Sequence, residues 1–176
     1  MSGIPGVDVR KLTPHADARG DLREVWRASQ QPLAVRQVLV TNSLAGALRG
    51  MHYHLRQADV CYVTAGRVFM ALIDLRGPFE KVELRLGPDA SVLVPPMVAH
   101  GYLAETDATI GYLLTDEADG SDEFGFRFDD PEAKIDWPKK DPILSRRDRD
   151  AGTLAAARTA VQAQLTGIRA ADQSGR

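Results

Sequence analysis

Short apolar runs alternate with polar and turn-forming residues through the middle of the chain. The runs are rich in β-branched and aromatic side chains, which is typical of half-buried strands. The predicted strands are Val35–Val40, Val60–Thr64, Arg67–Asp74, Glu80–Leu86, Ser91–Val94 and Thr109–Leu114. Strands this short and closely spaced predict a mainly β fold, a sandwich or a barrel.

Turn residues separate these strands. Gly66 lies between two of them and predicts a tight hairpin, because glycine readily adopts a positive φ. Pro95 and Pro96 supply no backbone donor for a central strand, so they predict an edge or a loop. We expect that loop to carry the following residues back toward the core, which makes His100 a candidate for a shared site with earlier histidines.

The last third of the chain has a different pattern. The acidic stretch 116–130 predicts an exposed, solvated loop, and beyond Pro142 the composition shifts to Ala, Arg and Leu. Apolar residues recur there at helical spacing, at Leu154, Val161, Leu165 and Ile168, which indicates an amphipathic helix docked on the domain or on a partner. We therefore expect one domain over residues 1–149 and a helical extension with a frayed tail over residues 150–176.

Composition narrows the classes of partner. The chain has 22 Lys and Arg against 24 Asp and Glu, a net charge of -2, which argues against a surface for nucleic acid. Its longest apolar run, 68–73, is too short to span a bilayer, and its first residues lack the layout of a signal peptide. The single cysteine, Cys61, lies in an apolar run and predicts a buried, reduced thiol. We expect a cytoplasmic protein with neither a nucleic-acid nor a membrane partner.

Candidate chemistry is concentrated between Gly46 and Gly66, where His52, His54 and Asp59 stand close together. Residues i and i+2 of a strand share a face, so the two histidines are expected to point the same way. One hypothesis makes His52 a proton-abstracting base. Another makes His52, His54, Asp59 and His100 ligands of a divalent transition metal, since the spacing resembles that of metal-dependent cupins. Two histidines in a strand are also compatible with a purely structural role.

Nearly the whole chain resembles the dTDP-4-dehydrorhamnose 3,5-epimerases. The segments that carry the resemblance occur in the family's order; they are Asp17–Gly20, Arg36–Gln37, Leu48–Tyr53, Ile73–Arg76, Ala99–Tyr102, Asp130–Pro131, Ile135–Pro138 and Leu144–Asp148. The resemblance implies a cupin jelly roll that forms a homodimer and works without a cofactor. It also implies epimerisation of a nucleotide-diphospho 4-keto-6-deoxy sugar, expected to be a dTDP sugar, at C3, C5 or both.

By this resemblance His52 is the catalytic base, Asp148 is the carboxylate that orients it, and Tyr112 is the acid on the opposite face. The positions that would bind the substrate are Arg19, Glu24, Gln37, Arg49, Asp59, His100 and Glu123. Each has a plainer interpretation. The arginines suit ordinary surface ion pairs, and the spacing Ser145-x-x-Asp148 also fits half of a helix capping box.

The chain departs from the family pattern beside the predicted reaction centre. Asp59 stands where the family has a lysine that stabilises the enolate, and His54 stands where glutamine is common. Leu39 replaces an asparagine, the loop after His52 is shorter, and 117–118 lacks a second tyrosine. A carboxylate near a developing enolate is unfavourable unless it is neutralised. A histidine bound to a metal cannot also accept a proton, so the two hypotheses compete for His52. We favour the metal-free epimerase, because Asp148 and Tyr112 have a use in epimerisation that a metal site does not require; the alternatives are a metal-dependent cupin and a non-catalytic nucleotide-sugar binder.

Overall fold

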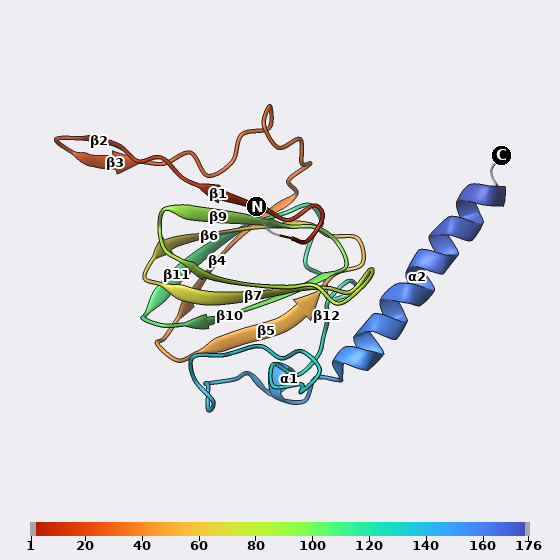
Figure 1. Ribbon diagram of the computed structural model, residues 1–176. Coiled ribbons are helices and arrows are strands. Elements are labelled where there is room, and N and C mark those ends of the chain that lie inside the picture. The colour runs from red at the N-terminus through yellow and green to blue at the C-terminus, as the bar shows by residue number, and fades with distance from the viewer. Residues whose placement is uncertain (1–2, 175–176) are drawn as a thin grey trace.

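The computed structural model describes residues 3–174 and places two five-stranded antiparallel sheets face to face (Figure 1). The first sheet contains, in order, β1 (Asp8–Lys11), β9 (Ala90–Val94), β6 (Asp59–Ala65), β11 (Ala108–Leu114) and β4 (Gln37–Ser43). The second contains β12 (Phe124–Gly125), β5 (Leu48–Tyr53), β10 (Val98–Ala104), β7 (Val68–Asp74) and β8 (Lys81–Leu86). The chain passes repeatedly between the sheets, as in a jelly roll, so the predicted mainly β cupin fold is confirmed.

Two apolar clusters explain the patterns in the strands. Cys61 and Ile110 of the first sheet pack against Met70 and Leu72 of the second, and they form the core between the sheets. The alternate residues of β7 belong to a second cluster on the outer face, which the C-terminal segment covers. Because β7 is buried on both faces, its sequence is continuously apolar rather than alternating.

The predicted turns are present. Gly66 has a φ of 80°, and a Cβ added there would lie 2.1 Å from the carbonyl oxygen of Asp107, so the tight turn between β6 and β7 requires glycine. The two strands lie in different sheets, so the turn crosses from one sheet to the other and the prediction of a hairpin was wrong. The proline pair lies in the loop between β9 and β10. That loop returns the chain so that His100 of β10 pairs directly with His52 of β5.

Two helices follow the sheets, the short α1 (Arg146–Arg149) and the long α2 (Leu154–Ser174). Leu154, Ala157 and Val161 are buried against the outer cluster, and burying a leucine side chain contributes about 1.5–3 kcal/mol. The docked face ends there, because Ile168 is 43% exposed and the helix extends away from the sandwich (Figure 1). Docking of an amphipathic helix is thus confirmed for the first half of α2, and the expectation that Ile168 shares that face was wrong.

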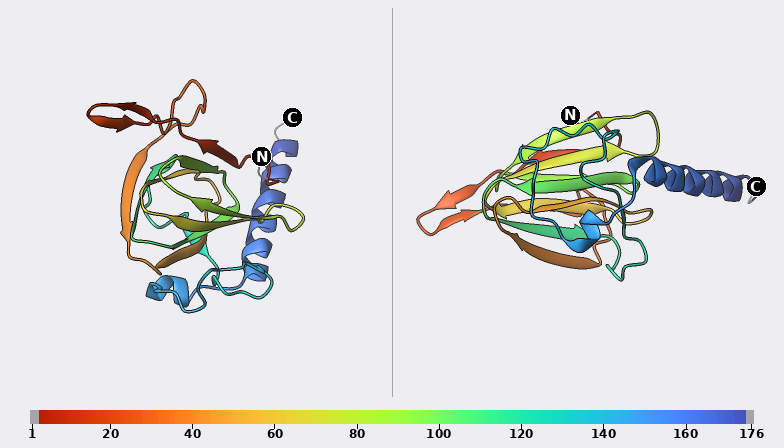
Figure 2. Two further views of the ribbon diagram at one scale, coloured as in Figure 1. Left: turned by 60° about the vertical axis from the view of Figure 1, so that its left-hand side comes forward. Right: turned by 90° about the horizontal axis from the view of Figure 1, so that it is seen from below.

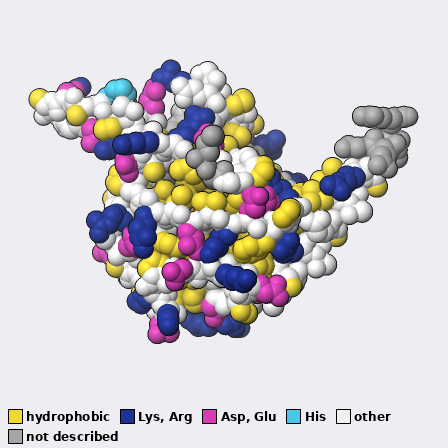
Figure 3. Space-filling view, viewed as in Figure 1, with side chains coloured by type: hydrophobic (Ala, Val, Ile, Leu, Met, Phe, Trp, Pro, Cys, Tyr) yellow, Lys and Arg dark blue, Asp and Glu magenta, His cyan; other side chains and the backbone are white. Residues whose placement is uncertain are grey.

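The N-terminal hairpin of β2 (His15–Asp17) and β3 (Gly20–Leu22) projects from the sandwich in every view (Figure 2). Lys and Arg side chains are interspersed with Asp and Glu over the face that Figure 3 presents. Within residues 3–174, no helix combines the length and the apolar character needed to cross a membrane.

Candidate active site

A cleft of about 190 Å³ opens between the two sheets at the end where β5 and β11 face each other. Inward-pointing positions of five strands line it, which follows from the alternation of side chains along each strand. The lining residues are Leu39, Thr41, Arg49, His52, His54, Gln57, Asp59, His100, Tyr102, Tyr112, Leu114, Ala118, Glu123 and Arg147. The cleft therefore brings together segments from Leu39 to Arg147, which are far apart in the sequence.

His52 forms a hydrogen-bonded pair with a carboxylate from the C-terminal segment. Its Nε2 lies 2.6 Å from Oδ1 of Asp148. Asp148 is buried in α1, and its own backbone N–H donates to the Ser145 hydroxyl, the N-cap of that helix. The capping role and the pairing with His52 thus coexist, the first through the backbone of Asp148 and the second through its side chain.

The electrostatics of this pair favour an ionised carboxylate. Burial by itself raises the pKa of Asp148, but the hydrogen bond to His52 and the charge of that ring outweigh it, so the pKa lies below its ordinary value. A carboxylate that stays ionised can hold the imidazole in one orientation and stabilise it when it gains a proton.

Tyr112 lies on β11 in the opposite sheet, beside Cys61 of β6 and Leu39 of β4 in the strand register. Burial raises the pKa of its hydroxyl well above the ordinary value, and the neighbouring Cys61 and Tyr102 add to the effect. Tyr112 is therefore protonated at neutral pH. Burial also raises the pKa of Cys61, which agrees with the predicted buried thiol.

A second group of ionisable side chains lies deeper in the cleft. Oδ2 of Asp59 is 3.5 Å from Nε2 of His54 and 3.4 Å from Nε2 of His100, and all three residues are buried. The amide of Gln57 donates to the other oxygen of Asp59 at 2.8 Å. Among residues 3–174, these two histidines and this aspartate are the group whose ligand atoms lie within 4.8 Å of one another. His52 is outside the group, so the four ligands of the alternative metal hypothesis do not converge in this structure.

The protonation of this cluster differs from residue to residue. Burial lowers the pKa of His100 to about 4, so its ring is neutral at pH 7. Burial also opposes the charge of His54, but Asp59 and the carbonyl of Asp122 outweigh it and raise the pKa of His54. The pKa of Asp59 is lowered, because the two histidines and Gln57 outweigh its burial. Asp59 is thus an ionised carboxylate beside the predicted base.

Asp122 organises the loop that follows His54. Its carboxylate accepts hydrogen bonds from the backbone N–H groups of residues 55, 56 and 57 at 2.8, 2.9 and 3.0 Å, and its carbonyl accepts one from Nδ1 of His54 at 2.6 Å. Asp122 and Phe126 are buried and residues 124–125 form β12, so the prediction of an exposed, solvated loop over 116–130 was wrong at these positions. Nothing in the sequence distinguishes it from its exposed acidic neighbours, because its partners are backbone groups about 65 residues away.

The residues predicted to bind the substrate fall into two sets. Arg49 and Glu123 line the cleft, where Arg49 donates to the Ser43 hydroxyl at 3.1 Å and Glu123 pairs with Arg147. Gln37 lies at its edge and accepts from the backbone N–H of Ala118, which lines the cleft. Sequence reasoning missed Gln57, which no motif distinguishes, and Arg147, although Arg147 lies in the segment Leu144–Asp148 that resembles the family.

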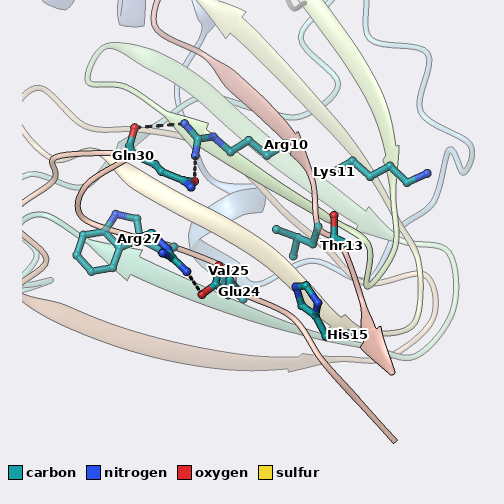
Figure 4. Close-up of a pocket in the computed structure, with 10 residues that line it drawn as sticks. Arg10, Lys11, Thr13, His15, Glu24, Val25, Arg27 and Gln30 are labelled. Carbon is teal, nitrogen blue, oxygen red and sulfur yellow. Dashed lines mark hydrogen bonds and ion pairs between the residues drawn. The ribbon is translucent and has the colours of Figure 1, made fainter. Parts of the chain in front are cut away.

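Arg19 and Glu24 do not join the cleft of their own chain. Arg19 is exposed on the projecting hairpin and pairs with Asp17. Glu24 pairs with Arg27 in a separate hollow beside β1, shown in Figure 4. Neither residue is among those that line the cleft.

Comparisons with known proteins agree with this architecture. A sequence profile of the family described as dTDP-4-dehydrorhamnose 3,5-epimerase matches residues 2–156. The chain is 36% identical to a dTDP-4-dehydrorhamnose 3-epimerase of Streptomyces niveus, over 90% of this chain and 84% of that protein.

Solved structures are similar as well. The rmlC epimerase of Mycobacterium tuberculosis superposes with a TM-score of 0.85 at 30% identity, covering 91% of this chain and 90% of that one. A 3'-monoepimerase of Streptomyces bikiniensis, in complex with dTDP-quinovose, superposes with a TM-score of 0.84 at 27% identity, over 97% and 98% of the two chains. The length of the matches and the shared fold together establish that this chain belongs to the dTDP-4-dehydrorhamnose 3,5-epimerase family.

Proposed function

We propose that this protein is a nucleotide-sugar epimerase that inverts C3, C5 or both carbons of a dTDP-4-keto-6-deoxy sugar. The observation that carries the proposal is the placement of the His52–Asp148 pair and Tyr112 on opposite sheets of one cleft. A sugar ring held between the sheets would have a base on one face and an acid on the other. That arrangement is what an inversion requires.

The reaction follows from these groups. The C4 ketone acidifies the protons on the two adjacent carbons, and neutral His52 removes one of them to form an imidazolium and an enolate. Tyr112 then donates its proton to the same carbon from the opposite face, which restores the ketone with inverted configuration. His52 returns its proton to solvent, and the tyrosinate regains one. Both proton transfers use side chains, so they require no cofactor.

Recognition of the diphosphate is proposed for Arg49, whose guanidinium lines the cleft and can make paired hydrogen bonds to phosphate oxygens. Gln37 and Glu123 lie at the rim, where they would contact the nucleotide. Among similar structures, those in complex with dTDP-4-keto-L-rhamnose and with dTDP-quinovose support a dTDP sugar as the ligand.

We also propose a homodimer in which Arg19 and Glu24 reach the cleft of a second copy. Two observations support it. Both residues lie outside the cleft of their own chain, Glu24 in the hollow shown in Figure 4 and Arg19 in the turn between β2 and β3. In addition, β4 is the edge strand of its sheet and exposes Val38 and Val40 at 58% and 63%, an apolar edge that a second chain would cover.

The dimer can be tested by complementation. The variants His52→Ala and Arg19→Ala are mixed after mild unfolding and refolding. Each alone is expected to be defective. The mixture is expected to regain up to about a quarter of the wild-type activity, because about half of the dimers are mixed and one of the two sites in each mixed dimer keeps both residues. Activity that stays at the sum of the separate variants would contradict shared sites.

The reaction itself is tested by solvent exchange. The protein is incubated in D₂O with dTDP-4-keto-6-deoxyglucose, and deuterium is located by NMR. Incorporation at C3, C5 or both is expected, and the position identifies the carbon that is inverted. Folded protein that binds dTDP and incorporates no deuterium would leave the alternative of a non-catalytic binder.

A further inference from the structure

His54 and His100 each direct Nε2 toward the same oxygen, Oδ2 of Asp59. Nδ1 of His54 lies 2.6 Å from the carbonyl of Asp122, and a carbonyl can only accept, so this nitrogen carries the proton. The other ring nitrogen of His54, Nε2, faces Oδ2 of Asp59 at 3.5 Å. The raised pKa of His54 favours a proton on this nitrogen, and a metal ion bound there would take the place of that proton. In His100, Nδ1 is directed at the carbonyl of Val98 at 3.5 Å, and Nε2 likewise faces Asp59.

The neighbouring Gln57 does not supply a donor to Oδ2 of Asp59. The amide of Gln57 uses its 2.8 Å hydrogen bond on Oδ1 of Asp59, which leaves Oδ2 for the two rings. The same amide nitrogen lies 3.4 Å from Nε2 of His54, which is long for a hydrogen bond. The three ligand atoms lie close together in a buried place, so a positive species must lie between them, either the proton of a charged His54 or a metal ion.

The separations fit a metal ion better than direct hydrogen bonds. Distances of 3.4 and 3.5 Å exceed the usual 2.7–3.2 Å of an N–H···O bond. Two ligand atoms bound to one ion at about 2.0–2.1 Å and at the tetrahedral angle lie about 3.3 Å apart. Two imidazoles and one carboxylate are also a suitable ligand set for zinc, iron or manganese.

The surroundings resemble the second shell of a metal site. Ligating histidines commonly donate their other N–H to a carbonyl, as His54 does to Asp122, and ligating carboxylates are themselves hydrogen-bonded, as Asp59 is by Gln57. All three side chains also line the cleft, so an ion bound there would face the substrate.

We propose that His54, Asp59 and His100 bind a divalent transition-metal ion on the floor of the cleft. The site does not compete with the base, because His52 is outside the cluster and bonded to Asp148. The role of the ion rests on the proposed epimerase function. Its two positive charges would exceed the single negative charge of Asp59, so the cluster would become net positive and would stabilise the C4 enolate oxygen. A lysine is expected to supply that positive charge in other members of the family.

The test uses untagged protein, stripped with a chelator and titrated with Co²⁺ or Zn²⁺. One equivalent of Co²⁺ is expected to bind with visible absorption bands typical of tetrahedral coordination, and Zn²⁺ at a hundredfold excess over its Kd is expected to raise the Tm by about 5–10 °C. Asp59→Asn, which keeps the shape of the side chain, is expected to abolish both signals. His15→Ala, which alters an exposed histidine outside the cleft, is expected to keep them.

Failure of wild-type protein to bind either ion would overturn the proposal and indicate that a proton neutralises the cluster. Unchanged Co²⁺ bands in folded Asp59→Asn would also overturn it. These readouts are independent of turnover. Metal binding without deuterium exchange would contradict the epimerase function but not the metal site. Deuterium exchange by metal-free protein at the full wild-type rate would contradict the proposed role of the ion in stabilising the enolate.

Discussion

Replacement of Asp148 by asparagine isolates the charge that supports the base. The amide keeps the size of the side chain and the backbone N–H that Ser145 caps, so α1 should be preserved. What is lost is the ionised acceptor 2.6 Å from Nε2 of His52. Because the imidazolium forms only as the proton is removed, the loss falls mainly on the transition state.

The distance between His52 and Asp148 gives the size of the expected loss in kcat/KM. Two unit charges about 4 Å apart interact by about 4 kcal/mol at an effective dielectric of 20, which is appropriate to a partly exposed pair. The His52 side chain is 26% exposed, so we take about 3–4 kcal/mol. At 1.36 kcal/mol for each factor of ten, Asp148→Asn should lower kcat/KM by about 10² to 10³.

The assay is the initial rate of deuterium incorporation into dTDP-4-keto-6-deoxyglucose at several substrate concentrations. Asp150→Asn is the matched control, since Asp150 lies two residues further on, is exposed, and pairs only weakly with Arg146. The control should retain the wild-type rate. A loss of less than threefold in folded Asp148→Asn would refute the assignment of this carboxylate to the base.

Other predictions concern stability and binding. Asp122→Ala should lower the free energy of unfolding by about 3–5 kcal/mol in a urea titration, because three loop N–H groups lose their acceptor, whereas exposed Asp119→Ala should cost under 1 kcal/mol. Burial opposes the charge of Asp122, but the backbone N–H groups that donate to its carboxylate outweigh it and lower the pKa. The contribution of Asp122 to stability is therefore complete above about pH 5 and is lost as the pH falls through the pKa of the folded protein. Asp122→Asn should make the Tm fall less steeply with acid, and an unchanged slope would contradict this. Arg49→Ala should weaken dTDP binding by about 10- to 100-fold in calorimetry, with Arg67→Ala, outside the cleft, as the control; equal affinities would exclude a phosphate contact.

The strand pattern was predictable because it depends on local sequence. The predicted 109–114 and 80–86 strands differ from β11 and β8 by one residue at one end. The prediction for β4 ended too early, at Val40, because Thr41 to Ser43 look polar; the pairing of these residues with β11 extends the strand. Such pairing is a property of the fold and is not visible in a single run of residues.

The candidate site was only partly predictable for the same reason. His52 and His54 are close in sequence, and their period of two puts them on one face. The pairing of His52 with Asp148 came from family resemblance, since 96 residues separate them. Asp122 and Gln57 were not foreseen, because their roles depend on backbone groups and on a buried carboxylate that only the folded chain brings near.

In the proposed reaction His52 and Tyr112 act on opposite faces of one sugar. The most direct measurement follows both exchange and configuration in D₂O with the variant Tyr112→Phe, which keeps the ring but removes the acid. His52 can still remove a proton and return deuterium from its own side, so we predict incorporation with retained configuration and little or no epimer. His52→Ala should show neither exchange nor inversion. Inversion by Tyr112→Phe at a rate near that of the wild type would contradict the account.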